Sequence, residues 1–165
     1  MLEAVTMVVF PLLLAYAAAT DFLTMTIANR VSLLLIAFFA ILAPFAGLGL
    51  AAVGWHLAAG LAVFAVGYIC FALGWMGGGD VKFGAAIALW LGWGQLMDFA
   101  LLFSVFGGLL TVLTLVVSRL IRPLPLLQVG FLAEFPEKRT VPYGIALAAA
   151  GLFLYPGTPF VRALL

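Results

Sequence analysis

Charged residues are scarce in this chain of 165 residues, of which only 8% are Asp, Glu, Lys or Arg. An ordinary soluble chain carries about 25% charged residues, which help to cover its surface. Here 67% of the residues are hydrophobic, and too few charges remain to shield them from water. The composition therefore excludes a typical soluble domain and indicates an integral membrane protein.

Cysteine and histidine each occur once, as Cys70 and His56. A single cysteine forms no internal disulfide and no cysteine-based metal site, so we expect Cys70 to be a small buried hydrophobic residue. His56 begins an apolar run and Asp98 lies beside a predicted turn. We expect both to be interfacial residues, and neither has an obvious polar partner in the sequence. The sequence predicts no metal site and no cofactor.

The few charges fall into three groups, and the distances between the groups predict the number of membrane crossings. The groups are Asp21 with Arg30; Asp80 with Lys82; and Arg119, Arg122, Glu134, Glu137, Lys138 and Arg139. A membrane helix needs roughly 20 apolar residues, so residues 31–74 and 83–118 each have room for two helices. One further helix fits before the first group and one after the third. The spacing predicts an all-α polytopic membrane protein with about six transmembrane helices, of which the fourth is short and tilted or buried among its neighbours.

Two crossings between successive groups place all three groups on one side of the bilayer. That side holds six of the seven basic residues and leaves only Arg162 on the other. The positive-inside rule makes it the cytoplasmic side, with both termini outside. Trp55, Trp93 and Tyr155 fall near the predicted outer ends, where an interfacial aromatic belt would lie.

The first apolar segment, residues 3–19, has the length of a signal peptide and ends in three alanines. Glu3 gives its n-region the wrong sign for a signal peptide, which carries Lys or Arg there. We therefore expect a permanent membrane span. The longest non-membrane segment, residues 119–140, is too short for a soluble domain, and the sequence predicts a single domain over residues 1–165.

Two aspartates, Asp21 and Asp80, lie at predicted cytoplasmic helix ends. Each alone could be a solvated residue paired with Arg30 or Lys82. Two close carboxylates, however, cannot both ionise easily and can hold one proton between them. Such a pair suits peptide hydrolysis, because the ionised acid activates water while the protonated acid polarises the scissile carbonyl. Spacing alone leaves both interpretations open.

Three glycines, Gly77, Gly78 and Gly79, directly precede Asp80. Glycine lets a backbone approach a second chain closely, and a protease binds extended substrate through main-chain contacts. An ordinary turn between helices would also use three glycines, so they decide nothing alone. Lys82 is equally open: it could tune the aspartate pair, contact an acidic group of a substrate, or extend to the lipid headgroups.

Three stretches together resemble one known family. Residues 77–80, "GGGD", fit the GxGD signature of intramembrane aspartic peptidases. "DFLTMTIANR" (21–30) resembles the first-aspartate segment of type IV prepilin peptidases, "GGGDVKFGAA" (77–86) their second-aspartate segment, and "VPYGIALAAAG" (141–151) their final-helix segment. The stretches occur in the family's order and span most of the chain.

This resemblance implies an aspartic endopeptidase that removes the short basic leader from prepilins and pseudopilins in the bacterial inner (cytoplasmic) membrane. Asp21 and Asp80 would be the catalytic residues. The three glycines, Lys82 and Asn29 would bind substrate or support the site. The expected partners are these substrates and the lipid bilayer, with no nucleic acid; the oligomeric state stays open.

Two departures from the family pattern stand out. The proline of the family's Ile-Pro-Asn element is Ala28 here, which leaves the rigidity of that loop open. Longer members also carry an N-terminal cytoplasmic portion with paired cysteines that accompanies N-methylation of the new pilin terminus. This sequence has no such N-methyltransferase insertion, and it resembles the short, peptidase-only form of Tad/Flp pilus systems.

Two other functions compete with the peptidase. Intramembrane carboxylates also mark ion pathways, so a small proton- or ion-coupled transporter is the main alternative. A transporter would more often place its acids near the midplane, on broken helices or internal repeats. A noncatalytic assembly subunit of a pilus machine is the third possibility, and it would tolerate loss of either aspartate.

Overall fold

The computed structural model describes residues 2–121 and 141–162 of the chain. These ranges contain seven α-helices, two short 3-10 turns and no strand, so the all-α prediction is confirmed for them. The helices are α1 (Leu2–Thr24), α2 (Asn29–Leu42), α3 (Leu50–Ala72), α4 (Gly78–Leu91), α5 (Leu96–Ile121), α7 (Tyr143–Leu154) and α8 (Pro159–Arg162). Most of the third charge group, from Arg122 to Arg139, lies outside the described residues.

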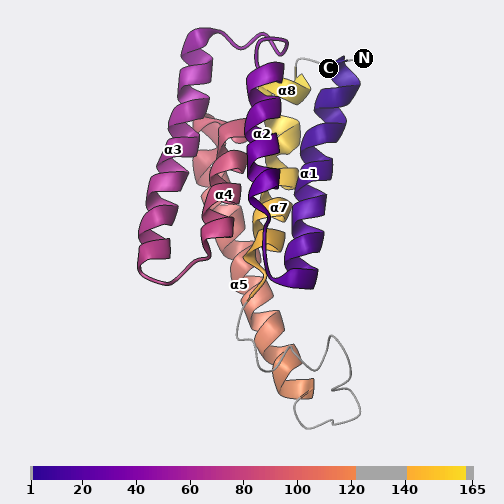
Figure 1. Ribbon diagram of the computed structural model, residues 1–165, viewed down its shortest axis with the longest axis vertical. Helices are drawn as coiled ribbons and strands as arrows, with labels where there is room; N and C mark the ends of the chain where they lie inside the picture. The colour runs from indigo at the N-terminus through magenta and orange to yellow at the C-terminus, as the bar shows by residue number, and fades with distance from the viewer. Residues whose placement is uncertain (1, 122–140, 163–165) are drawn as a thin grey trace.

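The longer helices run alongside one another and alternate in direction (Figure 1). The first turn of α1 and the short α8 consequently lie at the same end of the bundle. At the opposite end, at the bottom of Figure 1, α1 ends and α4 begins, so this end holds Asp21 and Asp80 and is called the aspartate end below. The other described members of the charge groups also lie there: Arg30, Lys82 and Arg119. The charge spacing thus predicted a shared end correctly, while its sidedness in the membrane stays a prediction.

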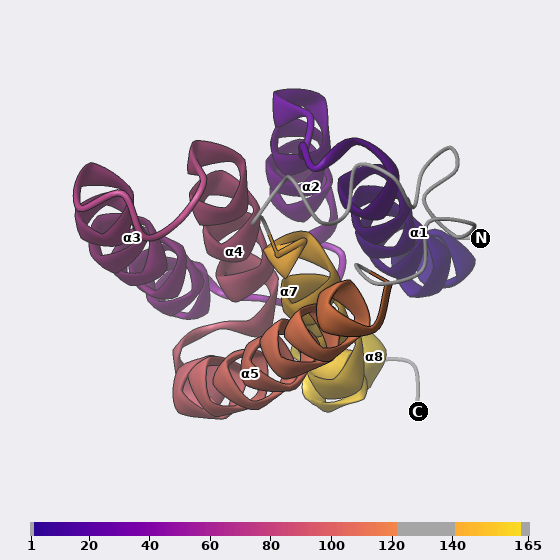
Figure 2. The same ribbon diagram turned by 90° about the horizontal axis from the view of Figure 1, so that it is seen from below.

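Seen from the aspartate end, α7 occupies the centre of the bundle (Figure 2). It packs against α1, α4 and α5. Helix α3 lies at the periphery and packs mainly on α4. Gly60 and Gly67 of α3 allow this close approach. A Cβ on Gly60 would lie 3.2 Å from the Ala85 carbonyl oxygen, and a Cβ on Gly67 would lie 2.9 Å from Val81. Small residues commonly let membrane helices pack this closely.

Within the part of the chain that the structure describes, three segments are long and apolar enough to cross a membrane: Met7–Thr24, Leu50–Ala72 and Trp93–Arg119. Their outward faces carry large apolar side chains such as Leu12, which is 61% exposed, and Leu109, 67% exposed. Such surfaces fit a lipid environment and are unfavourable in water. The chain is therefore a membrane protein, and the predicted total of six spans is not confirmed by helix length.

The fourth helix is short and buried, as the sequence predicted. Helix α4 has 14 residues, and every residue from Phe83 to Leu91 except Ala85 is buried. Trp90 is fully buried and donates a hydrogen bond from Nε1 to the Leu35 carbonyl oxygen at 2.9 Å, which ties α4 to α2. A helix enclosed by neighbours does not itself have to match the thickness of the lipid.

Two residues expected at the membrane interface are instead buried. Tyr155 is 5% exposed and stacks on Phe10 with ring centroids 4.5 Å apart. His56 is 6% exposed, and its Nδ1 lies 2.8 Å from the Leu89 carbonyl oxygen. Both predictions were wrong because burial depends on packing between helices, which position along the chain does not reveal. Trp55 and Trp93 remain exposed and form a ring contact at the end opposite the aspartates.

Candidate active site

Asp21 lies in the last turns of α1, and its side chain is only 4% exposed. Its Oδ2 accepts a hydrogen bond of 2.8 Å from the backbone N–H of Gly144, 123 residues further along the chain. Gly144 is in the first turn of α7, where backbone N–H groups have no partner within the helix. The N-terminus of a helix carries partial positive charge and stabilises a carboxylate. The start of α7 therefore holds Asp21 in place.

Asp80 lies in the first turn of α4 and is partly buried. Gly77 is the N-cap residue of this helix, and its backbone N–H donates a hydrogen bond to the Asp80 carboxylate. A side chain three residues after the N-cap commonly bonds back to the N-cap N–H in this way. The carboxylate is thus fixed by the backbone turn that precedes it.

The two aspartates are brought together by the fold. Asp21 is close enough to Asp80 for the two charges to repel one another. Neither carboxylate has a cationic partner among the described residues, so the pairings with Arg30 and Lys82 that the sequence left open do not occur. The site is a pair of carboxylates held by the N-termini of two helices.

The loop between α1 and α2 contacts the starts of α4 and α7, the helices that hold this pair. Met25 has a φ of 53°, a left-handed conformation that is strained for a non-glycine residue. The turn brings Ile27, 9% exposed, against the first turns of α4 and α7. A Cβ on Gly79 would lie 3.3 Å from the Ile27 carbonyl oxygen, and one on Gly144 would lie 2.7 Å from Ile27 Cδ1. Ile27 therefore joins the two helix starts that hold the aspartates.

The three glycines before Asp80 each contact a different part of the chain itself. A Cβ on Gly77 would lie 2.9 Å from Asp80 Oδ2, and one on Gly78 would lie 3.4 Å from the Phe71 ring. The third glycine, Gly79, lies against Ile27, as described above. A side chain at Gly77 or Gly79 would thus disturb the site, whereas a Cβ at Gly78 would make an ordinary contact; contact of the glycines with substrate stays a prediction.

Lys82 and Asn29 contact one another rather than the aspartates. Lys82 Nζ donates a 3.0 Å hydrogen bond to Asn29 Oδ1. Successive residues of an α-helix are about 100° apart, so Lys82 points about 200° away from Asp80. Lys82 thus lies on the opposite side of α4 from the aspartate pair.

Ala28, which stands where the family has proline, already has a conformation suited to proline. Its φ of −66° and ψ of 132° lie where the proline ring would fix φ and where an extended residue begins a helix. The departure from the family pattern therefore leaves the backbone geometry of this loop as proline would set it.

Sequence reasoning gave no role to Gly144 or Ile27. A glycine two residues after Pro142, at the start of an apolar helix, was the available signal, because a helix N-terminus commonly binds an anion. The sequence alone did not show that the anion is the Asp21 carboxylate, because Asp21 is on the first helix, 123 residues away along the chain. No three His, Cys, Asp or Glu side chains gather as a metal site in residues 2–121 and 141–162.

Comparison with known proteins gives one match. The family model of the type IV leader peptidase family matches residues 8–112, more than half of the chain and a range that contains both aspartates. Gly144 lies beyond that range. No curated protein and no solved structure matches the chain.

Proposed function

The chain belongs to the type IV leader peptidase family, and we propose that it is an aspartic endopeptidase in which Asp21 and Asp80 are the catalytic pair. One observation carries the proposal: two carboxylates from different helix ends lie close enough to interact, with no cation beside them among the described residues. Two carboxylates in this arrangement favour a state in which they share one proton.

Hydrolysis by this pair needs no other group. The ionised carboxylate takes a proton from a water molecule, and the resulting hydroxide attacks the carbonyl carbon of the scissile peptide bond. The protonated carboxyl donates its hydrogen bond to the carbonyl oxygen, where negative charge develops. The C–N bond then breaks as the leaving nitrogen takes up a proton from the pair. The products are the leader with a new carboxyl terminus and the mature protein with a new amino terminus.

A cavity of about 410 Å³ next to the pair supports a route for the substrate. Met76 and Tyr143, which line it, directly precede Gly77 and Gly144, the residues whose N–H groups hold the two carboxylates. Helix α5 contributes Gly107 to another wall. In this proposal the apolar segment of the substrate approaches from the α3–α5 side and its extended backbone reaches the aspartates.

The substrates proposed are prepilins of the Flp type, whose short basic leader is joined directly to a hydrophobic segment. The resemblance of the chain to the short, peptidase-only form of the family supports this choice. Such a substrate places its scissile bond at the membrane surface while its apolar helix stays in lipid. A site at helix ends suits that bond, because Asp21 and Asp80 lie at one end of the bundle.

The aspartate end is proposed to face the cytoplasm of a bacterium, with the peptidase in the inner membrane and both termini outside. The distribution of basic residues supports this orientation, because six of the seven lie in the groups assigned to that side. A leader made in the cytoplasm would then reach the pair without crossing the membrane.

A transporter is less consistent with these observations. A proton or ion pathway would continue polar groups through the bundle, and the cores of α4 and α7 are apolar from Phe83 to Leu91 and from Ile145 to Leu154. The carboxylates lie at helix ends, whereas transporter sites lie near the middle of the membrane.

Co-expression with a candidate Flp-type prepilin tests the proposal. Asp21→Asn and Asp80→Asn should each reduce cleavage by at least about 10³-fold, because an amide neither takes up nor delivers the proton. Asp98→Asn is the matched control, since Asp98 is exposed in the first turn of α5 at the other end of the bundle. It should cleave like the wild type.

Membrane-extracted amounts of each variant have to be equal for this comparison. Near-normal processing by either single variant would exclude the two-aspartate mechanism. It would leave the noncatalytic assembly role as the better explanation.

A further inference from the structure

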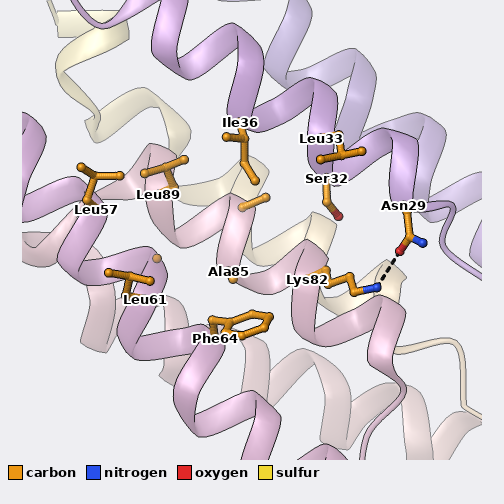
Figure 3. A pocket seen from close by; sticks show the side chains of 12 residues that line it. Asn29, Ser32, Leu33, Ile36, Leu57, Leu61, Phe64, Lys82, Ala85 and Leu89 are labelled. Atoms are coloured by element: carbon orange, nitrogen blue, oxygen red, sulfur yellow. Dashed lines mark hydrogen bonds between the residues drawn. The ribbon is translucent and has the colours of Figure 1, made fainter.

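A second cavity, of about 510 Å³, lies between α2, α3 and α4 (Figure 3). Lys82, Ala85, Ala86 and Leu89 form its α4 wall. These positions recur every three or four residues and therefore share one face of the helix. That face is the one opposite Asp80, so this cavity, called the α2–α4 groove below, is separate from the aspartate pair.

The polarity of the groove changes along its length. Asn29 and Lys82 form its mouth at the aspartate end, joined by their hydrogen bond (Figure 3). Ser32 follows about one helical turn deeper. Beyond Ser32 the lining is apolar: Leu33, Ile36, Leu57, Leu61, Phe64 and Leu89. A charged and polar mouth thus leads into a hydrocarbon-like interior.

Ser32 marks a specific place for a ligand atom. Its side chain is only 5% exposed, and its Oγ has no hydrogen-bond partner. Figure 3 shows the hydroxyl pointing into the groove. A buried hydroxyl without a partner is unfavourable, so a ligand that accepts its hydrogen bond gains affinity.

We propose that the α2–α4 groove binds one membrane phospholipid. The phosphate lies at the mouth, where Lys82 supplies the positive charge and Asn29 an amide N–H. An ester carbonyl oxygen of the lipid, a few ångströms deeper, accepts the hydrogen bond of Ser32. One acyl chain continues along the apolar walls.

Charge and size favour this occupant over a substrate helix. A helix is about 10 Å across even at its narrowest, so about 6 Å of its length, roughly one turn, would fill 510 Å³. A single hydrocarbon chain is much thinner and can extend through the groove. The groove also lies on the side of α4 away from Asp80, where a scissile bond could not reach the pair.

Native mass spectrometry of the full-length protein in detergent tests the proposal, with phosphatidylglycerol as the probe. One molecule should be retained per protein, and a diacylglycerol with the same acyl chains should bind at least about tenfold more weakly because it lacks the phosphate. Excess inorganic phosphate should not displace the lipid. Displacement by phosphate, or equal binding of diacylglycerol, would overturn the proposal.

Three variants probe the mouth, the hydroxyl and the apolar part separately. Lys82→Gln should weaken phosphatidylglycerol binding about tenfold, and Ala85→Phe should abolish it by filling the groove. Ser32→Ala should weaken binding about fivefold while raising the melting temperature of the lipid-free protein, since an unpartnered hydroxyl has been removed. A purely structural role for Ser32 would not give these opposite changes.

Matched controls lie outside the groove. Arg119→Gln removes a positive charge at the same end of the bundle, Ser104→Ala removes an exposed hydroxyl of α5, and Ala100→Phe adds an exposed ring to α5. All three should bind phosphatidylglycerol like the wild type. Equal retention by the groove variants and their controls would overturn the proposal, as would displacement of the lipid by a prepilin peptide. Cleavage is not part of these measurements, so their outcome is independent of the proposed peptidase activity.

Discussion

Gly144→Ala should disable the site without removing either carboxylate. The added Cβ would lie 2.7 Å from Asp21 Oδ2, 2.7 Å from Ile27 Cδ1 and 3.0 Å from Asp21 Cβ. Carbon atoms in contact prefer a separation of about 3.5–4.0 Å, so the methyl group is about 1 Å too close to the Ile27 carbon. Ile27 Cδ1 is the tip of a flexible side chain and can move. The Asp21 Cβ cannot, because it is fixed to the backbone of α1.

The strain must therefore separate the start of α7 from the end of α1. That movement lengthens the 2.8 Å hydrogen bond that holds the Asp21 carboxylate. Overpacking of this kind costs about 1–3 kcal/mol of stability, and misplacing a catalytic group by about 1 Å costs about 10²-fold in rate. We expect kcat for prepilin cleavage to fall about 10²-fold with little change in KM, because Gly144 orients Asp21 and is not among the residues that line the proposed substrate cavity.

Two further variants make the result interpretable. Gly54→Ala is the matched control, because a Cβ there has no atom within 4 Å and the substitution favours the α3 helix. Ile27→Val combined with Gly144→Ala removes the Ile27 contact and leaves the Asp21 contact, so it should not restore kcat. Wild-type kcat in Gly144→Ala would refute the reasoning, and full rescue by Ile27→Val would assign the strain to Ile27 instead.

Three other predictions follow from the loop, the charge distribution and the carboxylate pair. Ala28→Pro should raise the free energy of unfolding by about 0.4–1 kcal/mol, because Ala28 already has the φ of −66° that proline requires. Thermal melting measures this change, and a lower melting temperature would mean that the proline disturbs the preceding residue, Ile27. In a Cys70→Ser background, an impermeant thiol reagent should label Leu50→Cys but not Thr26→Cys in intact cells, and the reverse pattern would invert the proposed topology. The purified chain should cleave in the presence of chelators and without S-adenosylmethionine, because the carboxylates themselves activate water; a methyl group on the product in mass spectrometry would contradict the peptidase-only proposal.

The sequence predicted the features that depend on distance along the chain. Apolar segments between charges predicted the order of the longer helices in the described ranges and placed Asp21 and Asp80 at one end, whereas the predicted total of six spans is not confirmed. The shortness and burial of α4 followed from the same spacing. These predictions succeeded because helix length and the cost of burying charge are local properties of a membrane segment.

Features that depend on which helices touch were not predicted. Tyr155 and His56 are buried because Phe10 and the Leu89 carbonyl, far away in sequence, lie against them. Lys82 was grouped with Asp80 because the two are close in sequence. On a helix, however, residues two positions apart point in directions about 200° apart. The boundary of α4 at Gly78 was the missing information, because the angle applies only if both residues are helical.

The absence of a cation beside the pair, among the described residues, is itself part of the proposed mechanism. A lysine or arginine in contact would stabilise both carboxylates in ionised form and remove the proton that the carbonyl oxygen needs. The N-termini of α4 and α7 act more weakly: each supplies one N–H and a partial charge, worth about 0.3–1 kcal/mol. That is enough to orient two carboxylates and to stabilise a single negative charge, without displacing the shared proton. Lys82, directed to the other side of α4, leaves this balance undisturbed while its charge remains available at the lipid-facing groove.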